Sequence, residues 1–330
     1  MPLHEVYNLR MQQIEKFDSN GYYAYHLAEH HTPAVHSLAP SQNVFLAAAS
    51  QRTSQLKLAP CVYVLPLHHP LRLIEEISML DHLSKGRLEI GIGRGGVMEA
   101  FFWGQEADSE TNYLRYKETL DILKKGLNTD SLSYEGQFHK FDELPMRLGP
   151  VQRPYPPMWY MRNAETAALE GMNTVVVGTL ESLRAETIRF KRVWETTHGK
   201  NTQTAQGTEP KIGLVVHMVV AETDEEAIQI AKPAWEKYRW NLAAPRRIEA
   251  ERERFDNQSD REDPTRLGGV ALAGSPESVM RYMDEYVATG ANYFMCSFQW
   301  GDLDHDTAMK SISLFSSEVM PHYSQQAKSI

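Results

Sequence analysis

Short runs of apolar residues alternate along this chain with longer stretches whose apolar positions recur at helical spacing. The first stretch, 3–20, has the helical repeat and ends at Asn20-Gly21, a typical helix stop. The short runs predict strands at 22–28, 55–64, 88–92, 158–161, 174–177, 211–221 and 293–298. The longer stretches predict further helices at 44–52, 70–83, 111–126, 164–170, 180–197, 224–238 and 307–319, with one more beginning at Ser275-Pro276.

Two segments depart from this alternation. The segment 132–141 predicts an inserted hairpin that turns at Glu135-Gly136. The polar, charge-dense segment 241–267 is expected to form a surface insertion or a mobile lid. The remaining order of strands and helices indicates an α/β fold, with a parallel sheet that helices close or cover. Residues 1–330 are expected to form a single domain, because α/β barrels often have this length.

Composition and charge narrow the function. The formal charge of -9 disfavours a general nucleic-acid surface, which would be basic. No apolar run approaches the roughly 18 residues that a membrane span requires, and the first ten residues lack the apolar stretch of a signal peptide. The only two cysteines, Cys61 and Cys296, exclude a disulfide framework and fit a reducing compartment. We therefore expect a cytoplasmic enzyme that acts on a small molecule.

Histidines follow two of the predicted strands. Glu29, His30 and His31 lie at the end of the strand 22–28, where a histidine can exchange a proton near neutral pH. The alternative is that both histidines pack against the protein or face solvent.

His68 and His69 follow the next strand, so a metal cluster with the first pair has to be weighed. A hydrolytic metal site usually adds carboxylates or histidines from later strand ends. Those ends carry Met161, Val177 and Ser297 instead. The sequence therefore gives a metal site little support.

The segment 88–96, LEIGIGRGG, carries an arginine among glycines just after a predicted buried strand. Its glycines fit the nucleotide fingerprint G-x-G-x-x-G, but the match is weak because it lies in mid-chain with no clean amphipathic helix after it. Arg94 has the forked donor geometry that suits phosphate oxygens. The alternative is a structural arginine that pairs with Glu99 or with a helix end.

A second candidate anion site follows the strand 158–161. Met161, Arg162 and Asn163 precede the predicted helix 164–170, and a helix N-terminus offers free backbone amides to an anion. Arg162 adds charge of the appropriate sign.

Several motifs together resemble the bacterial luciferase-like, flavin-dependent monooxygenase family. They are AEHH (28–31), LPLHHPLRLIEE (65–76), LDHLSKGR (80–87), GIGRG (91–95), PVQRPYPPMW (150–159) and SFQWG (297–301). The likeness covers essentially the whole chain and implies a (β/α)8 TIM barrel.

The count of elements departs from that barrel, because the chain opens on a helix and provides only seven barrel strands. We therefore expect the first strand to be missing, or the barrel to close imperfectly, with a gap between 22–28 and 293–298. An upstream extension of about 10–20 residues is expected to fill the gap.

The resemblance also implies roles for individual residues. His30 aligns with the active-site histidine of the family, and Arg94, followed by Gly95 and Gly96, resembles the segment that holds the FMN 5′-phosphate. Cys61-Val62 occupies a position where the family often has a non-prolyl cis peptide beneath the isoalloxazine ring. Cys61 is otherwise just a small buried residue.

Met161, Arg162 and Asn163 occupy the turn where the family places a second set of phosphate contacts. The family is usually richer in Ser and Gly at this turn, so the individual contacts are not fixed by the resemblance.

The activity implied by the resemblance is that of a monooxygenase. Such an enzyme binds reduced FMN noncovalently, activates O2 as a flavin C4a-(hydro)peroxide and oxygenates a small organic substrate. Because no second nucleotide-binding unit is visible, a separate NAD(P)H:flavin reductase is expected to supply the reduced flavin. An F420-dependent oxidoreductase of the same fold and a non-catalytic flavin-binding protein are the alternatives.

Assembly is also implied by the resemblance. We expect a homodimer through the early helices, where 70–83 carries more apolar residues than one helix face needs. A heterodimer with a related chain, or a face that packs on the barrel, is the alternative. No metal, nucleic-acid or membrane partner is expected.

Overall fold

The computed structural model describes residues 1–31, 38–95, 103–105, 109–199, 203–243, 265–268 and 270–324. Its helices are α1 (Leu3–Ser19), α2 (Gln42–Ser50), η1 (Leu65–Leu67), α3 (Pro70–Leu83), α5 (Ser109–Gly126), α6 (Ala164–Leu169), α7 (Leu180–His198), α8 (Asp224–Ala243), α10 (Pro276–Val287), α11 (His305–Leu314), η2 (Phe315–Val319) and α12 (Met320–Ser324). Its strands are β1 (Ala24–Leu27), β2 (Lys57–Pro60), β3 (Tyr63–Val64), β4 (Ile90–Gly93), β5 (Ser131–Glu135), β6 (Lys140–Pro145), β7 (Met158–Tyr160), β8 (Thr174–Val176), β9 (Ile212–Val220), β10 (Arg266–Gly268), β11 (Ala271–Gly274) and β12 (Tyr293–Ser297).

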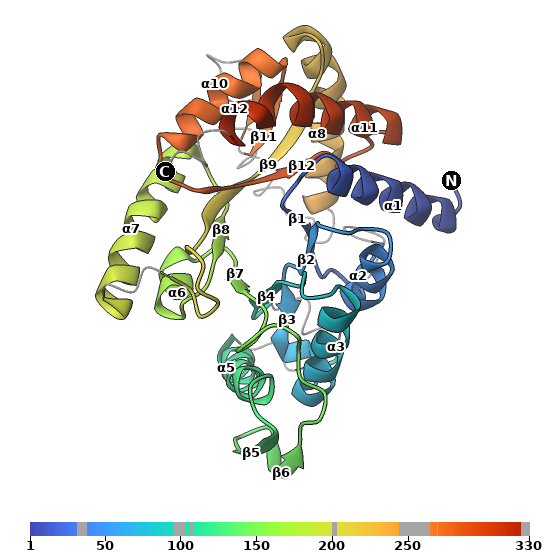
Figure 1. Cartoon of the computed structure of the whole chain (residues 1–330). Helices are drawn as coiled ribbons and strands as arrows, with labels where there is room; N and C mark the ends of the chain where they lie inside the picture. Colours follow the sequence, from blue (N-terminus) through green and yellow to red (C-terminus); the bar gives the residue numbers. More distant parts are fainter. Residues whose placement is uncertain are drawn as a thin grey trace.

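Most of the strands are parallel and neighbour one another in chain order. β1 pairs with β2, β3 with β4, and β4 with β7, while β8 and β12 both pair with β9. Isolated bridges join Leu58 to Leu88 and Trp159 to Asn173, which links these pairs into one parallel series. Figure 1 shows these parallel strands towards the middle of the molecule, with helices outside them, while the hairpin of β5 and β6 lies at its lower end. This is the α/β arrangement that the alternation of elements predicts.

The two ends of this series, β1 and β12, have no backbone pairing with each other among the described residues. Side chains join them instead, since His26 Nε2 lies 2.7 Å from the Tyr293 hydroxyl. A pocket of about 640 Å³ is lined by residues of both strands and of α1. A closed eight-stranded barrel is therefore not confirmed, and these are the two strands that the sequence expected to flank a gap.

The parallel strands depart from the sequence-based prediction in two places. The strand expected at 55–64 is two strands, β2 and β3, separated at the cis peptide Cys61–Val62. The strand β11 was not predicted, because its Ala-Leu-Ala-Gly sequence lacks the β-branched residues typical of strands. It forms because it pairs in parallel with the second half of β9, from Ala271 opposite His217 to Gly274 opposite Val220.

The segment 241–267 is described only at its ends. Residues 241–243 complete α8, which runs past its predicted end at 238, and Arg266–Gly268 forms β10 antiparallel to β11. The residues between lie outside the described part of the chain, so the expected insertion or lid stays a prediction there. The hairpin expected at 132–141 is present as β5 and β6.

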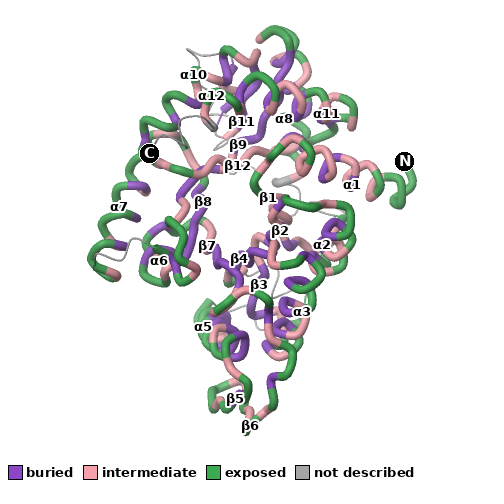
Figure 2. The backbone as a smooth tube through the Cα atoms, in the orientation of Figure 1, coloured by how far each residue is buried: buried purple, intermediate pink, exposed green. Residues whose placement is uncertain are grey.

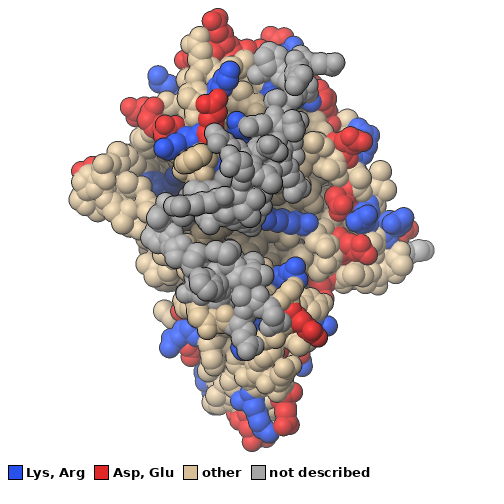
Figure 3. Space-filling view, turned by 180° about the vertical axis from the view of Figure 1, so that it is seen from behind, with Lys and Arg blue, Asp and Glu red and all other residues tan. Residues whose placement is uncertain are grey.

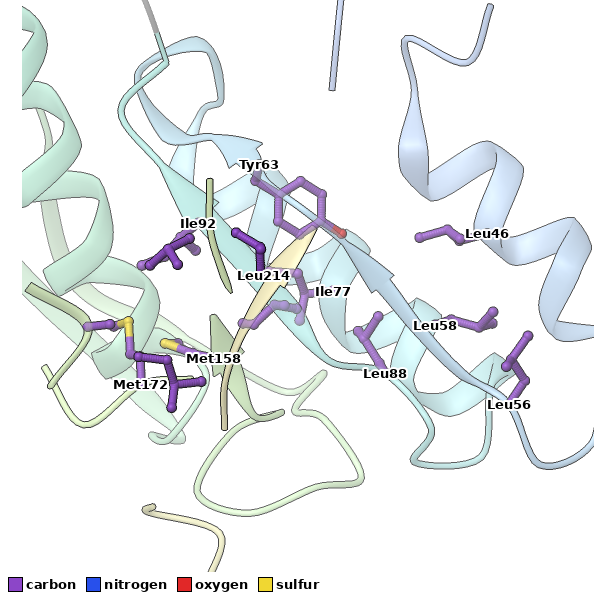
Figure 4. Packing of buried hydrophobic residues seen from close by; sticks show 14 of the residues in the cluster. Leu46, Leu56, Leu58, Tyr63, Ile77, Leu88, Ile92, Met158, Met172 and Leu214 are labelled. Carbon is purple, nitrogen blue, oxygen red and sulfur yellow. The ribbon is translucent and has the colours of Figure 1, made fainter. Parts of the chain in front are cut away.

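One large hydrophobic cluster draws on elements from α1 to η2. Figure 2 shows burial concentrated on the central strands, while the outer faces of α5 and α7 are exposed. Figure 4 shows strand-side residues such as Leu58, Leu88 and Met158 in the same cluster as Ile77 of α3. The central strands thus provide a buried frame, from whose ends the loops project.

Acidic and basic side chains are interspersed over the described part of the face seen in Figure 3. Within the described residues, no helix is long and apolar enough to cross a membrane.

Candidate active site

The site residues chosen from the sequence follow the carboxyl ends of neighbouring parallel strands. Cys61 and Val62 lie between β2 and β3, Arg94 and Gly95 follow β4, and Met161 follows β7. Parallel pairing brings these ends to one edge of the sheet, which is where α/β barrels carry their active sites. The Sγ atom of Cys61 lies 3.5 Å from the Sδ atom of Met161.

Three alternate glycines let β4 lie unusually close to the segment 60–64. A Cβ atom on Gly93 would lie 2.8 Å from Val62 Cγ2, and one on Gly95 would lie 2.4 Å from Val64 Cγ1. Gly95 also has a φ of +67°, which favours glycine. The glycines of GIGRG therefore serve strand packing as well as any approach to an anion. The sequence motif did not reveal this steric role.

Arg94 and Arg162 come from adjacent strand ends at the same level. Ile92 of β4 pairs with Tyr160 of β7, and each arginine lies two residues beyond its paired residue. Both arginines are exposed, and neither has a carboxylate partner among the residues that the structure describes. Two exposed cations at one sheet edge favour binding of an anion.

Arg94 also influences the neighbouring phenol. Burial raises the pKa of Tyr160, and the positive charge of Arg94 opposes that rise. The pKa of the Cys61 thiol is raised by burial and by the charge of Glu89, so this thiol stays protonated near neutral pH. Cys61 therefore lacks the character of a nucleophile.

Asn163 has a structural role that the sequence analysis did not predict. Its side chain accepts a hydrogen bond from the Thr166 amide at 2.9 Å and thereby caps α6. Since α6 has only six residues, its capped end is a weak anion site. Gly96, the remaining expected phosphate contact, lies outside the described residues.

A buried carboxylate joins the two histidine segments. Glu29 Oε2 accepts a hydrogen bond from the Val64 amide at 2.8 Å and lies 3.0 Å from His68 Nε2. Glu29 Oε1 lies 2.8 Å from His31 Nε2. His30, the histidine expected to act on the ligand, lies between Glu29 and His31 in the sequence and is partly buried.

Burial by itself would raise the pKa of Glu29. The hydrogen bond and charge of His68, the Val64 amide and the hydrogen bond from His31 outweigh burial, so the pKa lies below its ordinary value. Glu29 is therefore ionised at neutral pH. The structure describes no group of three or more side chains arranged to hold a metal ion, and here the imidazoles bond the carboxylate directly.

Sequence reasoning missed a second buried carboxylate beneath this edge. Glu89 accepts hydrogen bonds from the Tyr23 hydroxyl at 2.5 Å and from Trp159 Nε1 at 2.6 Å. The signal available was a glutamate inside the apolar run 88–92, since a charge in a buried strand needs partners.

Comparisons with known proteins agree with one another. A model of the luciferase-like monooxygenase family matches residues 5–293. The chain is 35% identical to the uncharacterized protein y4wF of Sinorhizobium fredii, over 94% of this chain and 90% of that protein. It is 24% identical to limonene 1,2-monooxygenase of Rhodococcus erythropolis, over 95% and 80% respectively. It is 27% identical to the oxygenase component of the flavin-dependent trigonelline monooxygenase of Acinetobacter baylyi, over 68% and 62%.

Solved structures share the fold. Monooxygenase RslO1 of Streptomyces bottropensis superposes with a TM-score of 0.81 at 23% identity, covering 96% of this chain and 93% of that one. The oxygenating constituent of 3,6-diketocamphane monooxygenase of Pseudomonas putida, in complex with FMN, gives 0.76 at 20% identity, covering 97% and 94%. The F420-dependent tetrahydromethanopterin reductase of Methanopyrus kandleri gives 0.70 at 18% identity, covering 96% and 94%.

Proposed function

Since the chain belongs to the luciferase-like monooxygenase family, we propose that it is an FMN-dependent monooxygenase that uses reduced FMN and O2 to oxygenate a small organic substrate. The observation that carries the cofactor assignment is the pair of arginines, Arg94 and Arg162, at adjacent strand ends, for which the described part of the chain provides no carboxylate partner. A phosphate dianion suits two such cations. Relatives named as monooxygenases, one of them flavin-dependent, support the reaction class.

The residues at this edge fit a flavin mononucleotide. Arg94, with Gly95 and Gly96 beside it, and Arg162 would hold the phosphate, while Cys61–Val62 and Met161 would lie against the ring. Asn163 would lie beside the phosphate, where its side chain caps α6. When bound, FMN supplies the chemistry of oxygen activation, and the protein supplies binding, orientation and exclusion of water.

His30 is proposed as the catalytic histidine, because it follows β1 at the edge that carries the other site residues. His30→Ala is expected to retain FMN binding and to release hydrogen peroxide in place of product. The ratio of product formed to oxygen consumed measures this loss. An unchanged ratio would remove His30 from the chemistry. His69→Ala is the comparison variant, because His69 packs on His139 and Phe141.

The reduced flavin is proposed to come from a separate NAD(P)H:flavin reductase. The relative named an oxygenase component supports such a division of labour. A cytoplasmic location remains a proposal from the cysteine content.

The test of the proposal is anaerobic titration with reduced FMN, followed by oxygen consumption with a reductase and a panel of organic substrates. FMN binding with product formation is the expected result. F420-dependent hydride transfer is the second candidate, because F420-dependent enzymes are among the structural neighbours. Preferential binding of F420 over FMN, read by visible absorption, would favour that candidate, and FMN binding without turnover would favour a flavin carrier.

We also propose a homodimer through α2 and α3. Met79 and Leu83 of α3 are 54% and 44% exposed, and Val44 of α2 is 73% exposed, although the other apolar residues of α3 pack inward. Light scattering is expected to give about twice the chain mass of 37.7 kDa. A mass equal to one chain at micromolar concentration would refute the dimer.

A further inference from the structure

The cluster around Glu29 has a proton chemistry that the proposed function has not used. Glu29 accepts hydrogen bonds from the Val64 amide, from His31 and from His68, and its pKa is lowered. An ionised carboxylate can only accept hydrogen bonds, so the facing Nε2 atoms of both imidazoles carry hydrogen. In neutral His68 the basic nitrogen is therefore Nδ1. Nδ1 has no hydrogen-bond partner among the described residues.

The cluster adjoins the strand pair that carries the candidate phosphate site. Glu29 bonds the Val64 amide, and Val64 lies against Gly95, the residue after Arg94. The Glu29 carboxylate thus connects His68 to the segment 61–64, where the flavin ring is proposed to lie. Its side chain is 24% exposed, whereas that of Glu29 is 1% exposed. The partly exposed His68 imidazole can therefore exchange protons with a bound ligand, while the Glu29 carboxylate that holds it is shielded from water.

We propose that His68 is a proton-transfer residue of the flavin site and that Glu29 is its positioning residue. The inference rests on the proposed FMN-dependent function. Without substrate, reduced FMN passes two electrons and two protons to O2, which gives oxidised FMN and hydrogen peroxide. With substrate, one oxygen atom enters the product and the other leaves as water. In both cases His68 accepts a proton at Nδ1 and passes it on, and the Glu29 carboxylate balances the charge of the imidazolium.

The groups that face His68 set how this step depends on pH. They are Glu29, His31 across the shared carboxylate, and the ring of Tyr63 at 5.7 Å. His31 and His68 share the Glu29 carboxylate as their hydrogen-bond acceptor. His69, the next residue, packs on His139 and Phe141 instead and is the matched control.

The first experiment follows re-oxidation of bound reduced FMN in aerated buffer by stopped-flow absorbance, between about pH 6 and 9. We expect His68→Ala to slow re-oxidation about 100-fold while the FMN dissociation constant stays within about threefold. Added imidazole is expected to restore part of the rate in His68→Ala and to have no effect on His69→Ala. Glu29→Gln is expected to slow the step about tenfold and to shift its pH profile.

The second experiment is independent of turnover. In apo protein with ¹⁵N-labelled histidine, the His68 signal, assigned by its loss in His68→Ala, is expected to show hydrogen on Nε2 and to move when oxidised FMN binds. The His69 signal is expected to stay in place. If FMN binds but the His68 signal stays fixed, or if re-oxidation is unchanged in His68→Ala, the inference is overturned and the proposed function stands. A wild-type protein that binds no FMN overturns both.

Discussion

Removing one arginine from the candidate phosphate site is expected to weaken FMN binding by a predictable amount. Arg94 and Arg162 lie at the same level on adjacent strands, and both are exposed. At about 4 Å in an aqueous environment one pair of unit charges is worth roughly 1 kcal/mol. The nearly doubly charged phosphate makes this roughly 2 kcal/mol, or about 30-fold in the dissociation constant. Arg94→Ala should therefore lose about 30-fold in affinity.

The assay is an anaerobic titration of wild type, Arg94→Ala, Arg162→Ala and the double variant with reduced FMN. Exposed charges are screened by salt, so the difference between wild type and Arg94→Ala should shrink when the ionic strength rises. If both side chains bind the same phosphate, the loss in the double variant should differ from the sum of the single losses.

Arg147→Ala is the control, because Arg147 is an exposed arginine after β6 and lies outside the candidate site. Its dissociation constant should equal that of wild type. Equal constants for Arg94→Ala and wild type would refute the assignment of the phosphate to this sheet edge. A loss that is large but insensitive to salt would indicate a structural role for Arg94 instead.

Two further predictions concern stability. Burial lowers the pKa of His217 to about 4 from 6.5, so between these pH values the unfolded state binds a proton more readily than the folded state. As the pH falls from 6.5 to 4, the free energy of unfolding of wild type should therefore fall by about 3 kcal/mol relative to that of His217→Phe. Urea unfolding at several pH values measures this difference, and an equal pH dependence in the two proteins would contradict it. A Cβ atom on Gly213 would lie 1.9 Å from the Tyr293 carbonyl oxygen. Gly213→Ala should therefore force β9 and β12 apart and lower the free energy of unfolding by about 1–3 kcal/mol. An unchanged thermal midpoint would show that the two strands can move apart without loss of stability.

Local signals in the sequence determined most of the elements. The helix 70–83 was predicted with its observed ends, because Pro70 fixes the first turn and the apolar repeat marks the buried face. The strands of the parallel series were also found, since a buried strand reads as a continuous apolar run. A glycine-rich segment after a strand predicted Arg94, a helix N-terminus predicted Arg162, and the resemblance to one family assigned the FMN phosphate to these segments.

Contacts between distant segments decided the rest. β11 exists because it pairs with β9, and its own residues carry little strand preference. β1 and β12 are joined by the side chains of His26 and Tyr293 and, among the described residues, by no backbone hydrogen bonds. Local sequence patterns do not show which of these two kinds of contact forms.

In the candidate site, too, some features follow from local sequence and others from tertiary contacts. The sequence by itself determined which side chains follow the strands, because hydrophobic periodicity and helix caps are local properties of the chain. Only the tertiary structure decided that Glu29 holds His31 and His68, that Asn163 is used as a cap, and that alternate glycines fit against Val62 and Val64. These roles depend on distances between residues far apart in the chain, and parallel strand pairing sets those distances.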